Sequence, residues 1–161
     1  MGHSGALPFF LKRSDDVIAA GAITSTAETV HGLLRLEGDR VVVQWRVERS
    51  TDRIGPEIRT DREVAPVREV AIPLGALAGG RVRASWWPWA AGRFVLTAAD
   101  LLAFEEVAGA TGLSLGHPAE LVVRIRRADL DAAREFLGDI EMALADRALR
   151  AAQEPGQLPP A

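Results

Sequence analysis

The stretch VHGLLRLEGDRVVVQWRV, residues 30–47, decides the fold class of this chain. Its apolar residues recur at every second position on both sides of the Glu37-Gly38-Asp39 triplet, which has the residue types of a tight turn. Alternation with a period of two is typical of a strand that is buried on one face only. The stretch therefore predicts a β-hairpin, and the rest of the chain is interpreted outward from it.

The same alternation returns downstream of this hairpin. It predicts further strands around Val70, Val82, Phe94 and Val123. Over residues 129–150 the apolar spacing changes to three and four, which predicts one amphipathic helix. We therefore expect an α+β fold that is mainly β, with about seven antiparallel strands in a partly open barrel or sandwich, capped by one C-terminal helix.

The chain of 161 residues is long enough for one packed domain. Residues 30–152 form the predicted domain, and residues 1–29 are interpreted as an N-terminal arm. A short helix is expected from residue 97 to 107, and a short strand around Leu113 and Leu115. Residues 153–161, which contain three prolines, are predicted to be a disordered tail.

Composition narrows the classes of function. A net charge of -3 argues against a nucleic-acid partner, because such domains are usually clearly basic. The absence of cysteine excludes disulfides and thiolate chemistry. No apolar run approaches the ~20 residues of a membrane span, so a cytoplasmic protein is expected. Frequent alanine, arginine and glycine are typical of a GC-rich bacterial genome.

From residue 30 to 150 the order of predicted elements resembles the pleckstrin-homology-like superfold. The chain also looks like a family of short, uncharacterised bacterial proteins with Val-Arg-Glu-Val-x-Ile-Pro-Leu, here residues 67–74, before a tryptophan-rich turn. The superfold hosts lipid binders, peptide binders and self-assembling modules, so the resemblance implies binding without selecting a ligand. Phosphoinositide recognition is not implied, because the loop that is basic in those members is here the tight acidic turn at residues 37–39.

No residue pattern of a known active site is present. His3, His31 and His117 are scattered and do not form a metal-binding pair. The adjacent carboxylates Glu105 and Glu106 would point in different directions on a helix. We therefore predict no enzyme, no catalytic residue, no metal and no cofactor.

Three tryptophans around a proline are the most unusual local feature. Trp86, Trp87 and Trp89 follow a predicted strand and are flanked by Arg83 and Arg93. In one interpretation Trp86 faces the core and the other two cover the end of the barrel. In the other, the three indoles form an exposed rim for a partner, for self-association or for a membrane interface.

Residues 49–66 break the alternation and carry charges of both signs. Arg53, Arg59 and Arg62 are candidates to bind an anionic group. The acidic residues among them favour the alternative, a solvated hairpin extension in which the charges pair with one another.

The N-terminal segment offers a third candidate site. Leu7, Phe9 and Phe10 precede Lys12 and Arg13, a pattern that could contact a membrane surface. The alternative is an arm that packs across the barrel.

These patterns favour a non-enzymatic binding or assembly module that acts through protein–protein contacts, including homo-oligomerisation. Two alternatives stay open: a peripheral membrane or lipid-binding module, and a small-ligand-binding β-barrel or enzyme with a cavity beneath the C-terminal helix.

Overall fold

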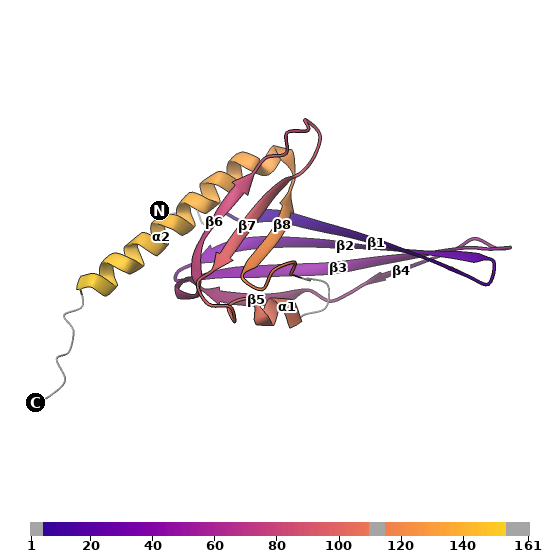
Figure 1. The fold of residues 1–161 in the computed structure, drawn as a ribbon, viewed down its shortest axis with the longest axis horizontal. Coiled ribbons are helices and arrows are strands. Elements are labelled where there is room, and N and C mark those ends of the chain that lie inside the picture. Colours follow the sequence, from indigo (N-terminus) through magenta and orange to yellow (C-terminus); the bar gives the residue numbers. More distant parts are fainter. Residues whose placement is uncertain (1–4, 110–114, 154–161) are drawn as a thin grey trace, which may run out of the picture.

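A computed structural model describes residues 5–109 and 115–153 of the chain. In these residues, eight strands form one open antiparallel sheet in the order β4-β3-β2-β1-β8-β7-β6, with β5 paired to β3 (Figure 1). The strands are β1 (Leu7–Ala19), β2 (Ala22–Glu37), β3 (Arg40–Ile54), β4 (Arg59–Val64), β5 (Arg68–Pro73), β6 (Leu77–Arg83), β7 (Gly92–Ala98) and β8 (Glu120–Ile125). The helices are α1 (Glu105–Gly109) and α2 (Leu130–Gln153), with 3-10 turns η1 (Leu74–Ala76) and η2 (Arg127–Asp129). The predicted α+β class is confirmed, and the sheet stays open.

The predicted hairpin at residues 30–47 is confirmed. Strands β2 and β3 pair from Glu37 opposite Arg40 through to Ile23 opposite Ile54. Gly38 has a φ of +60°, which suits the first position of a two-residue turn. Both strands are much longer than predicted. Their outer halves carry polar residues on both faces, so apolar alternation could not predict that these residues are in strands.

Residues 49–66 form the hairpin extension that was one of the two interpretations of this segment. Strand β3 continues to Ile54, and β4 then returns antiparallel to it, with Arg53 opposite Arg59. Residues 7–29 likewise belong to the sheet, as β1 and the first half of β2, rather than to an arm packed across it. Both segments belong to the sheet because their backbones hydrogen-bond to a neighbouring strand. Such bonding produces no apolar periodicity in a polar sequence, so the sequence did not predict it.

The outer halves of β1 to β4, residues 13–28 and 48–64, extend away from the rest of the domain as a single layer, which we call the arm (Figure 1). Every residue of β4 is exposed. We call the sheet face that carries Leu34, Val43 and Phe94 the inner face, and the opposite one the outer face. Directly paired residues of antiparallel strands point to the same face, so the register assigns each arm residue to one of them.

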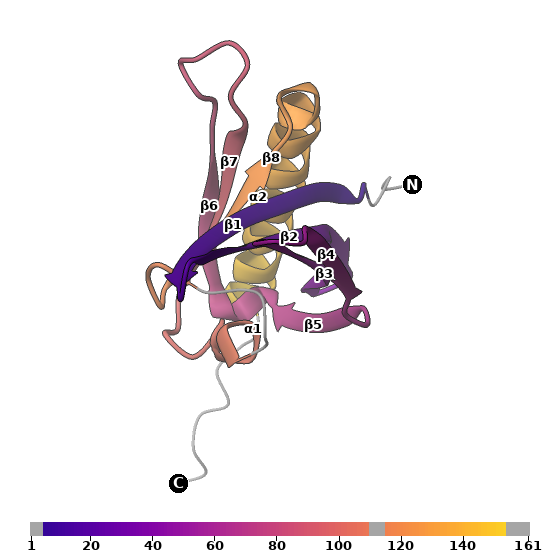
Figure 2. The ribbon, with the colours of Figure 1, turned by 90° about the vertical axis from the view of Figure 1, so that its right-hand side faces the viewer.

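Helix α2 covers the inner face of β6, β7 and β8 (Figure 2). Its buried residues are Leu130, Ala133, Phe136 and Ile140, so the predicted spacing of three and four is confirmed. The apolar spacing predicted Leu137 and Leu144 in place of Phe136, and these two are partly buried. The Phe136 ring lies 5.8 Å from that of Phe94. The C-terminal helix therefore closes the core over one end of the sheet.

The short helix predicted from residue 97 to 107 is mostly wrong. Strand β7 continues to Ala98, a turn follows, and α1 starts only at Glu105. Asp100 accepts a hydrogen bond from the Leu102 amide at 3.0 Å, so it stabilises the turn rather than a helix from Thr97. Leu113 and, apart from Gln153, the predicted tail lie outside the described residues.

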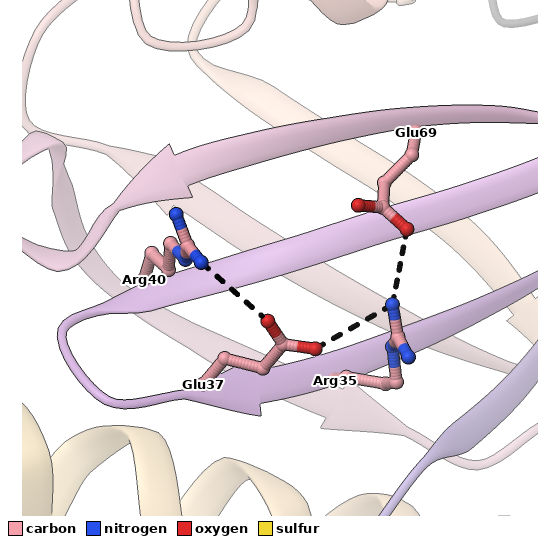
Figure 3. A network of polar contacts seen from close by, with 4 residues as sticks. All are labelled: Arg35, Glu37, Arg40 and Glu69. Carbon is pink, nitrogen blue, oxygen red and sulfur yellow. Dashed lines mark hydrogen bonds and ion pairs between the residues drawn. The ribbon is translucent and has the colours of Figure 1, made fainter.

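The outer face of β2, β3 and β5 carries a network of ion pairs (Figure 3). Arg35 contacts Glu69 at 3.0 Å and Glu37 at 3.5 Å, and Arg40 contacts Glu37 at 3.8 Å. All four side chains are partly exposed, so each pair contributes about 0–1 kcal/mol. On this part of the sheet, arginine charge is balanced within the chain.

Candidate functional site: the tryptophan turn and an arginine row

Residues 84–91, which connect β6 to β7, carry three exposed indoles; we call them the tryptophan turn. Trp86, Trp87 and Trp89 are 87%, 41% and 75% exposed. The interpretation that Trp86 faces the core is therefore wrong. The β6–β7 pairing ends with Arg83 opposite Arg93, and beyond it the backbone leaves the sheet, so alternation no longer decides which way a side chain points.

The three indoles contact one another in series. The Trp86 and Trp87 rings lie 4.6 Å apart and the Trp87 and Trp89 rings 4.9 Å apart, both edge to face. This geometry is favourable for aromatic pairs. The indoles thus form one aromatic cluster on the surface rather than three separate side chains.

Backbone contacts hold the turn in place. The Trp87 carbonyl accepts hydrogen bonds from the Ala90 amide at 3.1 Å and from Arg127 Nη1 at 3.4 Å. The Ser85 hydroxyl oxygen accepts one from the Trp87 amide at 3.3 Å. These bonds reduce the conformational entropy that the turn would lose on binding a partner.

Three arginines form a row across the strands directly behind the turn. Arg83 lies opposite Arg93, and Arg93 lies opposite Arg124 of β8. Because paired residues share a face, the three side chains stand together on the outer face, away from α2. Like charges placed directly opposite each other across strands are destabilising. We call these residues the arginine row.

Ion pairs within the described part of the chain do not neutralise the arginine row. Across residues 5–109 and 115–153, the ion pairs do not include Arg83, Arg93 or Arg124. The Arg124 guanidinium instead lies 5.9 Å from the centre of the Phe10 ring. Arg81, one row closer to the start of β6, does pair, with Glu120 at 2.9 Å. The uncompensated charge thus lies next to the tryptophan turn.

Arg53, Arg59 and Arg62 lie on the arm, away from the tryptophan turn. Arg59 pairs with Asp61 at 3.7 Å. Arg53 and Arg59 lie opposite each other on the inner face, whereas the register places Arg62 on the outer face. The three side chains therefore do not converge on one anion site.

The strongest ion pair of the arm joins two other residues. Arg49 Nε donates to Glu28 Oε1 at 2.8 Å, and Glu63 lies 4.0 Å from the same guanidinium. The hydrogen bond to Glu28, followed by the charge of Glu28, raises the pKa of Arg49 above its ordinary value.

The N-terminal candidate site is divided between core and surface. Leu7 and Phe9 are 1% and 3% exposed, so the folded domain does not present them to a membrane. Phe10 is partly exposed beneath Arg124, and Lys12 and Arg13 are exposed on β1. Alternation along β1 separates the buried Leu7 and Phe9 from Phe10 and Lys12 on the other face.

The hollows of the described surface differ in their lining, and one of about 480 Å³ on the inner face of the arm gathers polar side chains that include Arg13, Asp15 and Glu28. One of about 370 Å³ is lined by residues that include His31, Gln44 and Trp45. Another of about 210 Å³ lies beside Trp45, and its charged residues include the Glu28–Arg49 pair. Among the residues that the structure describes, no three histidine, aspartate or glutamate side chains are placed to hold a metal ion. No helix of that part of the chain is both long and apolar enough to cross a membrane.

Two surface features were missed by the sequence reasoning. Arg124 completes the arginine row, and the sequence Arg-Ile-Arg-Arg at 124–127 was a signal for it. The run VIAAGAI at residues 17–23 is uninterrupted by a polar residue and forms the turn at the end of the arm. Alternation with a period of two does not detect either one.

Comparison of the chain with protein-family models, with curated proteins and with solved structures finds no match.

Proposed function

We propose that this protein is a non-enzymatic binding or assembly module that acts through protein–protein contacts at the tryptophan turn. The observation that carries the proposal is the cluster of three exposed indoles beside a row of uncompensated arginines. Tryptophan and arginine are the residue types most enriched among those that dominate binding energy at protein interfaces.

Two features of the tryptophan turn and the arginine row favour a protein partner. The exposed indoles leave apolar area in water, which is regained when a partner covers them. The arginine row carries positive charge that no ion pair among the described residues compensates, and an acidic partner would supply the missing carboxylates. The favoured partner is therefore a protein surface that presents apolar side chains together with carboxylates.

The peripheral-membrane alternative loses its main support from the burial of Leu7 and Phe9. The indoles and arginines at the tryptophan turn could still contact lipid, so the two classes of partner need an experimental comparison.

The test compares the wild type with the Trp86→Ala/Trp89→Ala variant. Replacing two residues that dominate an interface is expected to weaken it ~30-fold or more. Sedimentation velocity would report self-association, and co-sedimentation with anionic vesicles would report lipid binding. The matched control is Met142→Ala/Leu149→Ala, which removes two exposed apolar side chains of α2 at 67% and 59% exposure.

Loss of self-association or of a captured protein partner in the tryptophan variant, but not in the control, would support the proposal. If neither property changes in the tryptophan variant, or if vesicle binding is the only property that it loses, the protein-binding function is wrong.

A further inference from the structure

A further group of exposed apolar side chains lies at the end of the arm. Val17, Ile18 and Ile23 are 59%, 77% and 42% exposed around the β1–β2 turn. Ile54 and Ile58, at the neighbouring β3–β4 turn, are 50% and 79% exposed. We call these five residues the arm tip. The remainder of the arm is predominantly polar, with Val64 at its base as the other large apolar residue exposed there, so most of the exposed apolar area lies at its end.

The register sorts the arm tip into rows. Ile18 lies opposite Ile23, and Ile23 lies opposite Ile54, which places three isoleucines side by side on the outer face. Directly behind them on the same face come Asp16 and Asp52, with Ser25 between the two. Neither aspartate belongs to an ion pair within the described residues. The outer face of the arm thus ends in an apolar row backed by an acidic one.

The β1–β2 turn, at the centre of the arm tip, contains a non-glycine residue in a strained backbone conformation. Ala20 and Gly21 connect β1 to β2 with φ values of +51° and +79°. A two-residue turn with both φ values positive favours Asn-Gly, because a non-glycine residue in this region is strained unless its side chain can bond locally. Alanine at this position gives up that stability and leaves the β1–β2 turn without a polar side chain, whereas the neighbouring β3–β4 turn carries the exposed Glu57.

The arm tip and the tryptophan turn are complementary in the order of their chemistry. At the turn, apolar indoles project beyond a row of unpaired arginines; at the arm tip, isoleucines project beyond a row of unpaired aspartates. Arg53 and Arg59 of the arm lie on its inner face and do not offset this charge. Arg62, the nearest outer-face cation of the arm, lies one row behind the aspartates.

We propose that the arm tip of one copy of this chain docks on the tryptophan turn of a second copy. This inference rests on the proposed function of the tryptophan turn and names its partner. When the two ribbons lie face to face with their ends pointing the same way, isoleucines meet indoles and aspartates meet arginines. Apolar burial then supplies affinity, and the matched charges supply orientation and specificity.

The contact is head-to-tail, because the two surfaces lie on different parts of one chain. In Figure 1 the arm projects to the right while the β6–β7 turn projects upward. Each copy therefore keeps one free arm tip or one free turn after a first contact. Such an interface builds a closed ring, the smallest of which is a two-fold dimer with two reciprocal tip–turn contacts, or an open chain of copies.

A complementation experiment tests the contact. The tip variant, Ile18→Thr/Ile23→Thr/Ile54→Thr, keeps β-branched residues in the exposed strands and removes apolar area. The turn variant is Trp86→Ala/Trp89→Ala. Native mass spectrometry and sedimentation velocity would follow each variant alone and in an equimolar mixture, after circular dichroism has confirmed that both fold.

The wild type is expected to form rings or chains as concentration rises, and each variant alone to associate at least ~10-fold more weakly. The mixture is expected to form a one-to-one heterodimer and nothing larger. In it, the intact tip of the turn variant docks on the intact turn of the tip variant. A charge exchange is the second measurement. Asp16→Arg/Asp52→Arg and Arg83→Asp/Arg93→Asp should each weaken association, and mixing the two should restore it.

Three results would overturn the inference. If the tip variant associates like the wild type while the turn variant does not, the tryptophan turn binds something other than the arm tip, and the proposed function survives. If both variants are monomers whose mixture gives no heterodimer, the two surfaces do not contact each other. If the wild type stays monomeric at every concentration and the tip variant instead loses binding to phosphatidylcholine vesicles, the arm tip inserts into lipid.

Discussion

Replacing Gly32 by alanine should expose how tightly the N-terminal strand is built into the core. A Cβ atom at residue 32 would lie 2.1, 2.4 and 2.7 Å from three atoms of the Phe9 ring. Phe9 lies directly opposite Gly32 in the β1–β2 register, and its ring is 3% exposed. The glycine therefore provides the space that the ring fills, and an added methyl group must displace the ring.

The expected cost follows from the size of this clash. Overpacking a filled core costs typically about 1–3 kcal/mol, and a 2.1 Å approach to a buried ring belongs at the upper end of that range. Gly→Ala in a strand also gains about 0.5–1 kcal/mol, because alanine loses less conformational entropy on folding. The net destabilisation is about 2 kcal/mol, which for a domain of this size lowers the Tm by roughly 4–8 °C.

Urea unfolding followed by circular dichroism measures this difference against a matched control. Gly138→Ala changes a glycine inside α2 whose Cβ would meet no other atom within 4 Å, so it should stabilise the domain by about 0.5–1 kcal/mol. The Gly32→Ala/Phe9→Ala double variant should cost less than the sum of the single variants, because they remove and fill the same space. If Gly32→Ala is as stable as the wild type, Phe9 is not packed on β2, and its availability to a membrane would have to be reconsidered.

Three further substitutions have expected effects on the free energy of unfolding. Ala20→Asn should raise the free energy of unfolding by about 0.5–1 kcal/mol in urea titrations, because asparagine tolerates the φ of +51°; an unchanged midpoint would contradict the strained turn. Trp45→Phe should cost less than about 1.5 kcal/mol, far less than the ~3–5 kcal/mol of Trp45→Ala, because it removes a buried indole N–H that has no acceptor. Equal losses for both Trp45 variants would refute this. Trp86→Ala/Trp89→Ala should change the free energy of unfolding of the monomer by no more than the ~0.5 kcal/mol typical of surface changes, and a larger loss in urea titrations would show that the turn supports the core.

The alternation of apolar and polar residues predicted the strands that carry Arg83 and Arg93, which are the part of the candidate site in regular structure. Arg83 and Arg93 could be assigned beside the tryptophans because they flank Trp86 and Trp89 in the sequence. Arg124 joins them only through the pairing of β7 with β8, which brings Arg124 opposite Arg93, 31 positions earlier in the chain. The exposure of Trp86 also depended on where the β6–β7 ladder ends, because an indole fits a core position as well as a surface turn.

The sequence by itself determined the α+β class, the central hairpin at residues 30–47 and the inward face of α2. In each of these, apolar residues recur with the period of the element, and burial of one face enforces that period. Only the tertiary structure decided that residues 13–28 and 48–64 extend as an arm, because backbone pairing of polar strands needs no apolar pattern. It also decided that the sheet stays open, and that Arg124 and Ile54 join surfaces assembled from distant segments, since strand register is a property of pairs of segments and not of either one alone.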